Sequence, residues 1–329
     1  MRYKWGHKLV LYHAVSSYQL LEVMLHRMQV HPEDRAILLL PDFIVEKYPQ
    51  YKKLRTMGFF HRVYLLPYLH IPHGQETEIV QAITRHCRRI LPYPLPAFSR
   101  VYVAGAHFYF SLCLIYSRIP FTFFEDGAGM LSQPERLHRA LSAGFPVHAA
   151  LAQKYGLYTG ENPWVQNIIC LKRAQTVDVS GPKYVDFSVE AALRALSPQA
   201  RRQVVHFFLP KPLEIRGQAI LLTQQFARLG RMTLAQQRQL YRRLGETVLQ
   251  GIPLAVKVHP DDTLDYGEIF PAAQLITVPF PAELLPYVGK CQPTHLYALD
   301  SAGCENLGSH FILHKIHWPA WLEGGDYHG

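Results

Sequence analysis

Two acidic side chains stand next to each other in the segment Phe123-Phe124-Glu125-Asp126-Gly127. The apolar residues before them predict a strand, so both carboxyls are expected at the point where that strand ends. Adjacent carboxyls repel each other, and partial burial raises the pKa of at least one of them. A carboxylate of this kind can act as a general base, with either Glu125 or Asp126 in that role. The alternative is an acidic turn that caps the next helix.

A second polar cluster follows an apolar run in the other half of the chain. Lys257 ends that run, and His259 and Pro260 come directly after it. Proline restricts the preceding residue to an extended conformation, which predicts that His259 lies at a strand end. An imidazole there can donate a proton to a leaving phosphate, and Lys257 can neutralise negative charge beside it. The chain has 18 histidines, so a capping or surface role for His259 is the alternative.

Two weaker signals come later in the chain. Glu283 follows Phe280 and is expected in the first turn of a helix, where the helix dipole stabilises a carboxylate. Ser301 lies in the segment Asp300-Ser301-Ala302-Gly303, after the last expected strand. A hydroxyl residue at the start of a helix can bind phosphate. The alternative for Glu283 is a routine acidic residue in the first turn of a helix, and the alternative for Ser301 is a helix cap.

These residues must be positioned by strands that alternate with amphipathic helices, a pattern that predicts parallel sheets built from βαβ units. The expected strands are Lys8–His13, Ala36–Leu40, Arg62–Leu66, Val101–Ala104, Phe121–Phe124, Ala219–Thr223, Leu254–Val258, Leu275–Val278 and His295–Leu299. The expected helices are Ser17–Gln29, Val45–Met57, Gln75–Leu91, Phe108–Ser117 and Thr233–Gln250, with short helices from Pro281 and after Ser301. Open α/β sheets bind ligands at the carboxyl ends of their strands.

The 329 residues fit about two domains of ordinary size. A proline-rich segment over 181–212 is expected to connect them. We therefore expect an N-terminal lobe with the base over 1–180 and a nucleotide-binding lobe over 213–329. If the chain transfers a sugar, the loops 67–75 and 92–98 of the first lobe would contact the acceptor. Their residues Tyr68, His70, His73 and Tyr93 suit stacking on sugar rings, and packing within the protein is the alternative role for them.

Composition excludes several classes of protein. The chain is 49% hydrophobic, which argues against disordered and fibrous proteins. Its net charge of +9 favours an anionic partner. The five cysteines form no C-x-x-C pair, which argues against a disulfide framework and a structural zinc site. No apolar run reaches the length of a membrane span. We expect a cytoplasmic protein and leave peripheral contact with an anionic inner membrane open.

In their joint order, Glu125-Asp126-Gly127, His259-Pro260, Glu283 and Ser301 resemble the motifs of bacterial GT-B sialyltransferases. The resemblance is to the lipooligosaccharide sialyltransferase and capsule polysialyltransferase families. Glu283 follows His259 by 24 residues and Ser301 follows it by 42, a spacing of the kind these families show. The segments Leu221-Leu222-Thr223-Gln224 and Phe280-Pro281-Ala282-Glu283-Leu284-Leu285 also look like lipooligosaccharide sialyltransferase segments.

The resemblance implies an α/β fold of the GT-B type, with two doubly wound, Rossmann-like parallel-sheet lobes and a cleft between them. It implies an inverting, metal-independent transfer of sialic acid from CMP-sialic acid to a hydroxyl of a surface glycan such as lipooligosaccharide or capsule. Glu125 or Asp126 would be the base and His259 the acid. The donor nucleotide would be bound by Lys257, Pro260, Thr223, Gln224, Phe280, Glu283 and Ser301. Within this set Glu283 would bind the ribose hydroxyls and Ser301 the phosphate.

The implied partners are a CMP-sugar donor and a glycan acceptor, with no cofactor, no metal and no nucleic acid. The absence of an Asp-x-Asp tripeptide and of a Cys/His cluster agrees with a metal-free reaction. These families usually carry a second Ser or Thr where this chain has Ala302, which leaves another CMP-linked sugar or a UDP-hexose open as donor. A second alternative is a non-catalytic basic protein that binds nucleic acid or an anionic membrane. The spread of its arginines over separate elements argues against that alternative.

Overall fold

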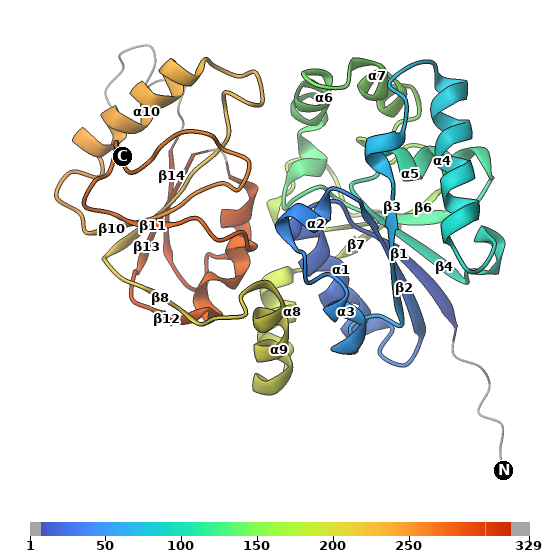
Figure 1. The fold of residues 1–329 in the computed structure, drawn as a ribbon, viewed down its shortest axis with the longest axis horizontal. Coiled ribbons are helices and arrows are strands. Elements are labelled where there is room, and N and C mark those ends of the chain that lie inside the picture. Colours follow the sequence, from blue (N-terminus) through green and yellow to red (C-terminus); the bar gives the residue numbers. More distant parts are fainter. Residues whose placement is uncertain (1–7, 300, 317–329) are drawn as a thin grey trace. The chain divides into compact units, whose positions relative to one another are not determined.

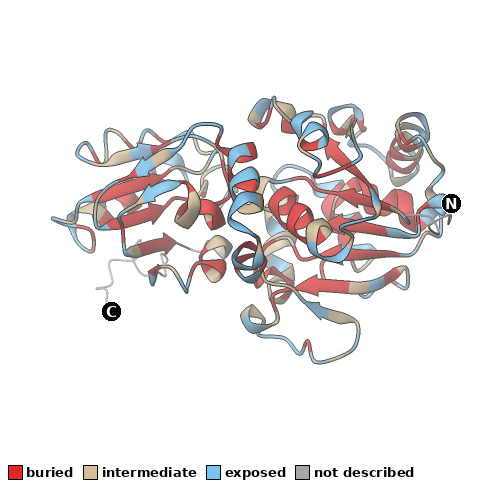
Figure 2. Ribbon diagram, turned by 90° about the horizontal axis from the view of Figure 1, so that it is seen from below, coloured by how far each residue is buried: buried red, intermediate tan, exposed pale blue. Residues whose placement is uncertain are grey.

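The computed structural model describes residues 8–299 and 301–316, with only the backbone described at Ala302. The chain divides between Phe207 and Phe208 into two compact units (Figure 1). Each unit is built around its own parallel sheet, and the buried residues lie mainly on the strands and on the inner faces of the helices (Figure 2). Among the described residues, no helix has both the length and the apolar character needed to cross a membrane.

The first unit contains a seven-stranded parallel sheet in the order β3-β2-β1-β4-β5-β6-β7. Its strands are β1 (Leu9–His13), β2 (Arg35–Pro41), β3 (Arg62–Leu66), β4 (Arg100–Ala104), β5 (Phe121–Phe124), β6 (Val165–Cys170) and β7 (Tyr184–Asp186). The helices are α1 (Ser17–Val30), α2 (Ile44–Lys47), α3 (Lys53–Thr56), α4 (Glu76–Ile90), α5 (Tyr109–Tyr116), α6 (Pro134–Ser142), α7 (Pro146–Lys154), α8 (Val189–Ala195) and α9 (Pro198–Phe208).

Helices cover both faces of this sheet because alternate strand residues point to opposite sides. On one face, Val103 and Phe123 share a core with Ile79 and Ile83 of α4. On the other face, Tyr102 and Phe124 pack against His26 of α1. Strands buried on both faces read as continuous apolar runs, which is why β1, β2 and β5 stand out in the sequence.

The second unit contains a five-stranded parallel sheet in the order β11-β10-β9-β13-β14, and a small pair, β12-β8. Its strands are β8 (Leu213–Ile215), β9 (Ala219–Leu222), β10 (Leu254–Lys257), β11 (Gln274–Ile276), β12 (Gly289–Cys291), β13 (His295–Leu299) and β14 (Ile312–Ile316). Helix α10 (Leu234–Glu246) buries Leu240, Tyr241 and Leu244 in the core of this sheet. Short 3-10 helices span Ala282–Tyr287 and Ala302–Asn306.

The predicted α/β architecture of two doubly wound lobes is confirmed, with differences in detail. The helix expected over Val45–Met57 is wrong, because two short helices stand there with Pro49 between them, and proline disfavours helical backbone at Tyr48. The helix expected from Pro281 is a 3-10 helix that contains Pro286. Part of the expected connecting segment belongs to the first unit, where β7 is the edge strand and α8 contacts α1.

Candidate functional site

Glu125 is a buried carboxyl that ties together the segments following two strands of the first unit. Its Oε1 accepts a hydrogen bond from the Leu171 N–H at 2.8 Å, just after β6. Its Oε2 accepts from Gln175 Nε2 at 2.9 Å and from the Leu131 N–H at 3.3 Å. Burial raises the pKa of Glu125 to about 7, against the lowering effect of these hydrogen bonds. Both oxygens are therefore committed to the protein's own structure.

Asp126 differs from its neighbour because a quarter of its side chain is exposed. Its Oδ1 accepts a hydrogen bond from Gln19 Nε2, and its Oδ2 lies 3.8 Å from His107 Nε2. Desolvation raises the pKa of Asp126 to about 7, and the Gln19 hydrogen bond opposes that rise. A reachable carboxyl whose pKa lies near neutrality can accept a proton from a substrate hydroxyl.

Gln19 is oriented by the start of helix α1. Ser16 is the N-cap, and its side chain accepts a hydrogen bond from the Gln19 N–H. The Gln19 side-chain oxygen accepts from the N–H groups of Val15 at 2.8 Å and Ser16 at 3.2 Å. Since the oxygen is bound to these two donors, the amide nitrogen must face Asp126. The helix cap thus fixes which atom of Gln19 meets the carboxylate.

Gly105, directly after β4, makes room for this amide. Its φ is +69°, which non-glycine residues rarely adopt. A Cβ atom at this position would lie 2.7 Å from Gln19 Nε2 and 2.8 Å from the Phe108 ring. Glycine is therefore needed here both for the backbone conformation and for the approach of Gln19.

His107 forms the other side of the Asp126 site. It is buried, and burial lowers its pKa to about 4, so the ring is neutral at pH 7. Its ring stacks on that of Tyr158 with 5.8 Å between the centroids. A neutral imidazole cannot hold the pKa of Asp126 at the low value that a cation would impose.

In the second unit, Thr223 and His259 lie beyond the carboxyl ends of neighbouring strands, β9 and β10. Thr223 Oγ1 accepts a hydrogen bond from the His259 N–H at 2.8 Å. The ring Nδ1 of His259 accepts from the Asp261 N–H at 3.2 Å, which places the proton of the neutral ring on Nε2. This tautomer makes Nε2 a hydrogen-bond donor.

The loop after His259 is held by a buried polar cluster. Asp262 Oδ2 accepts from Gln237 Nε2 at 2.8 Å and from the Tyr266 hydroxyl at 2.6 Å. Both partners are buried, Gln237 on α10 and Tyr266 in the core. The backbone that presents His259 is therefore anchored to the core of its unit.

Lys257, Phe280 and Glu283 form a second cluster in this unit. Lys257 Nζ lies 4.0 Å from the centroid of the Phe280 ring, a cation–π contact. Burial lowers the pKa of Lys257 to about 8, and the nearby Glu283 opposes this. Burial raises the pKa of Glu283 to about 7. Two oppositely charged groups thus share a desolvated site.

Glu283 Oε1 is buried and has no hydrogen-bond partner among the described residues. A Cβ atom at Gly303 would lie 3.5 Å from this oxygen and 3.5 Å from Ser301 Oγ. The side chains of Glu283 and Ser301 therefore both lie next to Gly303, which has no side chain of its own. An unpaired buried acceptor beside a hydroxyl is well suited to bind ligand hydroxyls.

Most of the expected residues lie in the Asp126 site of the first unit or in the two clusters of the second unit, around His259 and around Glu283. Others do not take part through their side chains. Gln224 is engaged through its backbone, where its N–H donates to the Tyr241 hydroxyl at 2.8 Å. Pro260 is exposed. Asp300 lies outside the described residues. Sequence reasoning missed Gln19 and His107. Gln19 has a local signal, because glutamine three residues after a serine is a capping-box pattern.

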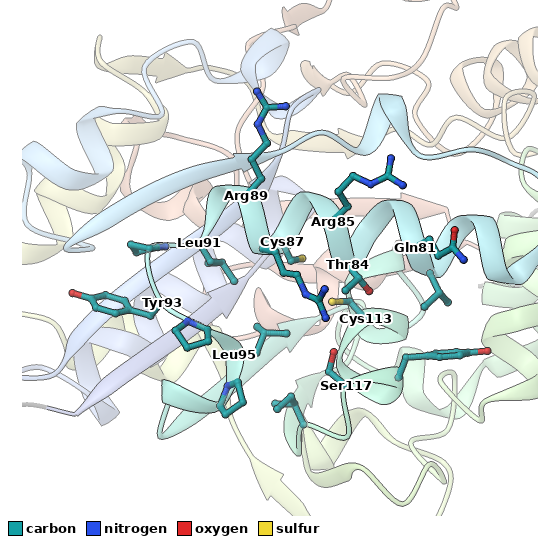
Figure 3. A pocket seen from close by; sticks show the side chains of 17 residues that line it. Gln81, Thr84, Arg85, Cys87, Arg89, Leu91, Tyr93, Leu95, Cys113 and Ser117 are labelled. Atoms are coloured by element: carbon teal, nitrogen blue, oxygen red, sulfur yellow. The ribbon is translucent and has the colours of Figure 1, made fainter.

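A large cavity of about 1260 Å³ lies elsewhere in the first unit (Figure 3). It is lined by α4, by the segment 91–96 and by the end of α5. That segment leads into the amino end of β4, so the cavity lies away from the carboxyl edge that carries Asp126. Tyr68, from the other loop expected to contact an acceptor, is buried and shares a hydrogen bond of 2.8 Å with His13. Across residues 8–299 and 301–316, no group of three His, Cys, Asp or Glu side chains is placed to hold a metal ion.

Several solved structures share this organisation. A Staphylococcus aureus structure, MnaA with UDP, has a TM-score of 0.56 and 11% identity, covering 93% of this chain and 78% of its own. The Methanocaldococcus jannaschii UDP-GlcNAc 2-epimerase, with UDP-GlcNAc and UDP, has a TM-score of 0.54 and 11% identity, covering 94% and 83%. The glycotransferase of kitacinnamycin has a TM-score of 0.53 and 11% identity, covering 94% and 80%.

At such identities the similarity shows the fold alone, and that fold is GT-B, as the sequence predicts. No family model matches the chain, and no curated protein matches its sequence.

Proposed function

We propose that the protein is a glycosyltransferase that moves a sugar from a nucleotide donor to a glycan hydroxyl. Our specific proposal is a sialyltransferase that uses CMP-sialic acid. The observation that carries the transferase assignment is Asp126, a reachable carboxyl with a pKa of about 7 that Gln19 and His107 flank at the carboxyl edge of a parallel sheet. The choice of CMP-sialic acid rests on the ordered motifs around Glu125, His259, Glu283 and Ser301.

Asp126, and not Glu125, is the proposed base. Glu125 accepts three hydrogen bonds from the protein, and its side chain is buried. Asp126 keeps a quarter of its side chain exposed and can reach an acceptor hydroxyl. In the proposed step Asp126 takes the hydroxyl proton while the acceptor oxygen attacks the anomeric carbon of the donor sugar.

The residues of the second unit suit the departing nucleotide. The bond between the anomeric carbon and the phosphate oxygen breaks as the acceptor attacks, which inverts the anomeric configuration. His259 Nε2–H donates to the leaving phosphate, and Lys257 neutralises its charge. Glu283 accepts hydrogen bonds from the ribose hydroxyls, and Ser301 donates to the phosphate. These side chains replace a divalent ion, so we propose that turnover needs no metal.

A second candidate is an enzyme that acts on a UDP-sugar, either a glycosyltransferase or an epimerase. The observation that favours it is the fold similarity to structures that contain UDP or UDP-GlcNAc. The two candidates require different contacts from the protein to the nucleobase, because cytosine and uracil present different hydrogen-bonding groups.

Thermal-shift measurements with CMP, CDP, UMP, UDP and GDP decide between them. CMP at about a hundredfold excess over its Kd should stabilise the protein by about 2.7 kcal/mol. Glu283→Gln should weaken CMP binding by about 1.5–3 kcal/mol, the contribution of a charged hydrogen bond. Deoxycytidine monophosphate should bind the wild-type protein more weakly and lose less affinity on this substitution. A larger shift with UDP than with CMP would assign the enzyme to UDP-sugars instead.

A further inference from the structure

A second cavity, of about 590 Å³, lies in the first unit between α6, α7 and the segment 156–161. Its lining includes Glu135, His138, Tyr158, Thr159 and Glu161. The volume falls within the usual range for small-molecule sites. We propose that this cavity binds a sugar residue of the acceptor glycan. The inference rests on the proposed transferase function and adds to it where the acceptor is held.

The cavity is connected to Asp126 by a series of ring contacts. The rings of His138 and Tyr158 form a T-shaped contact, with 5.7 Å between the centroids and an interplanar angle of 88°. Tyr158 stacks in turn on His107 at 5.8 Å, and His107 Nε2 lies 3.8 Å from Asp126 Oδ2. A sugar bound beside His138 and Tyr158 therefore lies within two side chains of the proposed base.

The lining carries polar groups that the protein itself does not pair. His138 Nδ1 and Thr159 Oγ1 are both shielded from water, and neither has a hydrogen-bond partner among the described residues. Unpaired buried polar atoms cost free energy, which a ligand hydroxyl recovers. Glu135 and Glu161 are exposed, and Glu161 lies near the amine of Lys183, whose pKa is lowered by burial and raised by the charge of Glu161. Carboxylates of this kind accept hydrogen bonds from sugar hydroxyls.

The segment that forms one wall of the cavity is firmly fixed. Gly160 has a φ of +76°, and a Cβ there would lie 2.5 Å from the side chains of Phe123 and Ile168. The loop therefore packs directly on β5 and β6, the strands that position Glu125 and Asp126. Lys183 Nζ donates to the Gly160 carbonyl at 2.6 Å. A fixed wall favours a binding site that is formed before the ligand arrives.

Saturation-transfer NMR on the full chain tests this inference. The probes are methyl β-D-galactoside, methyl β-D-glucoside and methyl α-sialoside. We expect the wild-type protein to transfer saturation to at least one of them. The double variant Thr159→Val/Glu161→Gln should reduce that binding about tenfold or more, because it removes one hydroxyl and one carboxylate while keeping side-chain size. Thr176→Val/Glu33→Gln makes the same changes at exposed positions outside the cavity and should bind as the wild type does.

Binding that is equal in the wild type and the double variant overturns the inference, as does the absence of saturation transfer to all three probes. The nucleotide thermal shift, measured on the same variants, separates this inference from the proposed function. An unchanged CMP shift in the double variant supports a defect confined to the cavity. Cavity-dependent sugar binding in a protein that responds to no nucleotide supports the sugar site and contradicts the transferase.

Discussion

The side-chain amide of Gln19 donates a hydrogen bond to Asp126, although 107 residues separate the two in the sequence. Its oxygen is held by the N–H groups of Val15 and Ser16, so the start of α1 determines what the carboxylate meets. The side chain of Gln19 thus links the cap of α1 directly to the proposed base. Asp126 keeps a pKa near neutrality because one neutral donor partly offsets its desolvation.

Gln19→Glu should raise the pKa of the proposed base while preserving the helix cap. A glutamate at this position still accepts the two cap hydrogen bonds, but it places a second carboxyl against Asp126. Like charge raises the pKa of Asp126 by about one unit or more, so the acidic limb of the rate profile should move to higher pH. The profile of kcat/KM against pH measures this.

The matched control is Gln236→Glu, which changes the equivalent residue in the capping box of α10, where the start of the helix is exposed. Its pH profile should be that of the wild type. If Gln19→Glu also left the profile unchanged, Asp126 would not be the group whose ionisation controls the rate.

Asp126→Asn and Glu125→Gln should fail in different ways. Asp126→Asn should lower turnover by about 10²–10⁴-fold, the usual contribution of general base catalysis, with little loss of stability. Glu125→Gln replaces one of the two acceptor oxygens by an amide nitrogen, which then faces either the Leu171 N–H or the donor of Gln175, and this should cost about 1–3 kcal/mol in the free energy of unfolding. Turnover and urea unfolding, measured on both variants, test the assignment. A large loss of turnover in Glu125→Gln with unchanged stability would reverse the two roles.

Nucleotide affinity should fall at alkaline pH because of Lys257. Burial lowers the pKa of this side chain to about 8, so its charge is lost as the pH rises through that value. The Kd of CMP should then increase by up to about tenfold per pH unit above 8. Lys257→Arg keeps its charge in this range and should flatten the dependence. Lys211→Arg, at an exposed position, should keep the wild-type dependence of the Kd on pH. A wild-type Kd that does not change with pH would show that Lys257 does not neutralise the charge of the phosphate.

Buried histidines should make the first unit sensitive to acid. Burial lowers the pKa of His13, His26 and His148 to about 3 and that of His107 to about 4. The unfolded chain takes up these protons near the ordinary value of 6.5, so stability is full above that pH and declines as the pH falls toward 4. Each histidine contributes up to about 1.4 kcal/mol per pH unit in this window. The raised pKa values of Glu125 and Asp126 act in the opposite direction.

His148→Phe isolates one of these contributions, because phenylalanine keeps the stacking on Tyr109 and cannot titrate. Its free energy of unfolding should depend less steeply on pH, by up to about 1.4 kcal/mol per unit. His206→Phe, at an exposed position, should keep the wild-type slope. Equal slopes for all three proteins in urea unfolding would show that His148 is not kept neutral by burial.

The sequence predicts the central strands well because their residues are buried on both faces. The sequence does not predict β6 or β14. Polar residues interrupt the apolar pattern of both strands, Gln166 and Asn167 in β6 and His314 and Lys315 in β14. The carboxyl pair and Lys257 can be placed at strand ends from the sequence. The contact between Gln19 and Asp126 cannot, because it depends on how α1 packs beside β5. The separate roles of Glu125 and Asp126 also require the structure, since only their surroundings differ.

The most direct test of the proposed metal-independent sialyltransferase is a transfer reaction with CMP-sialic acid and a mixture of glycan acceptors in the presence of EDTA. We predict that the wild-type protein releases CMP and forms a sialylated product with inverted anomeric configuration, detected by mass spectrometry and NMR. Asp126→Asn should form about 10²–10⁴-fold less product. Consumption of a UDP-sugar with CMP-sialic acid left intact would contradict the proposed donor. Activity that EDTA abolishes and Mg²⁺ restores would contradict the metal-independent mechanism.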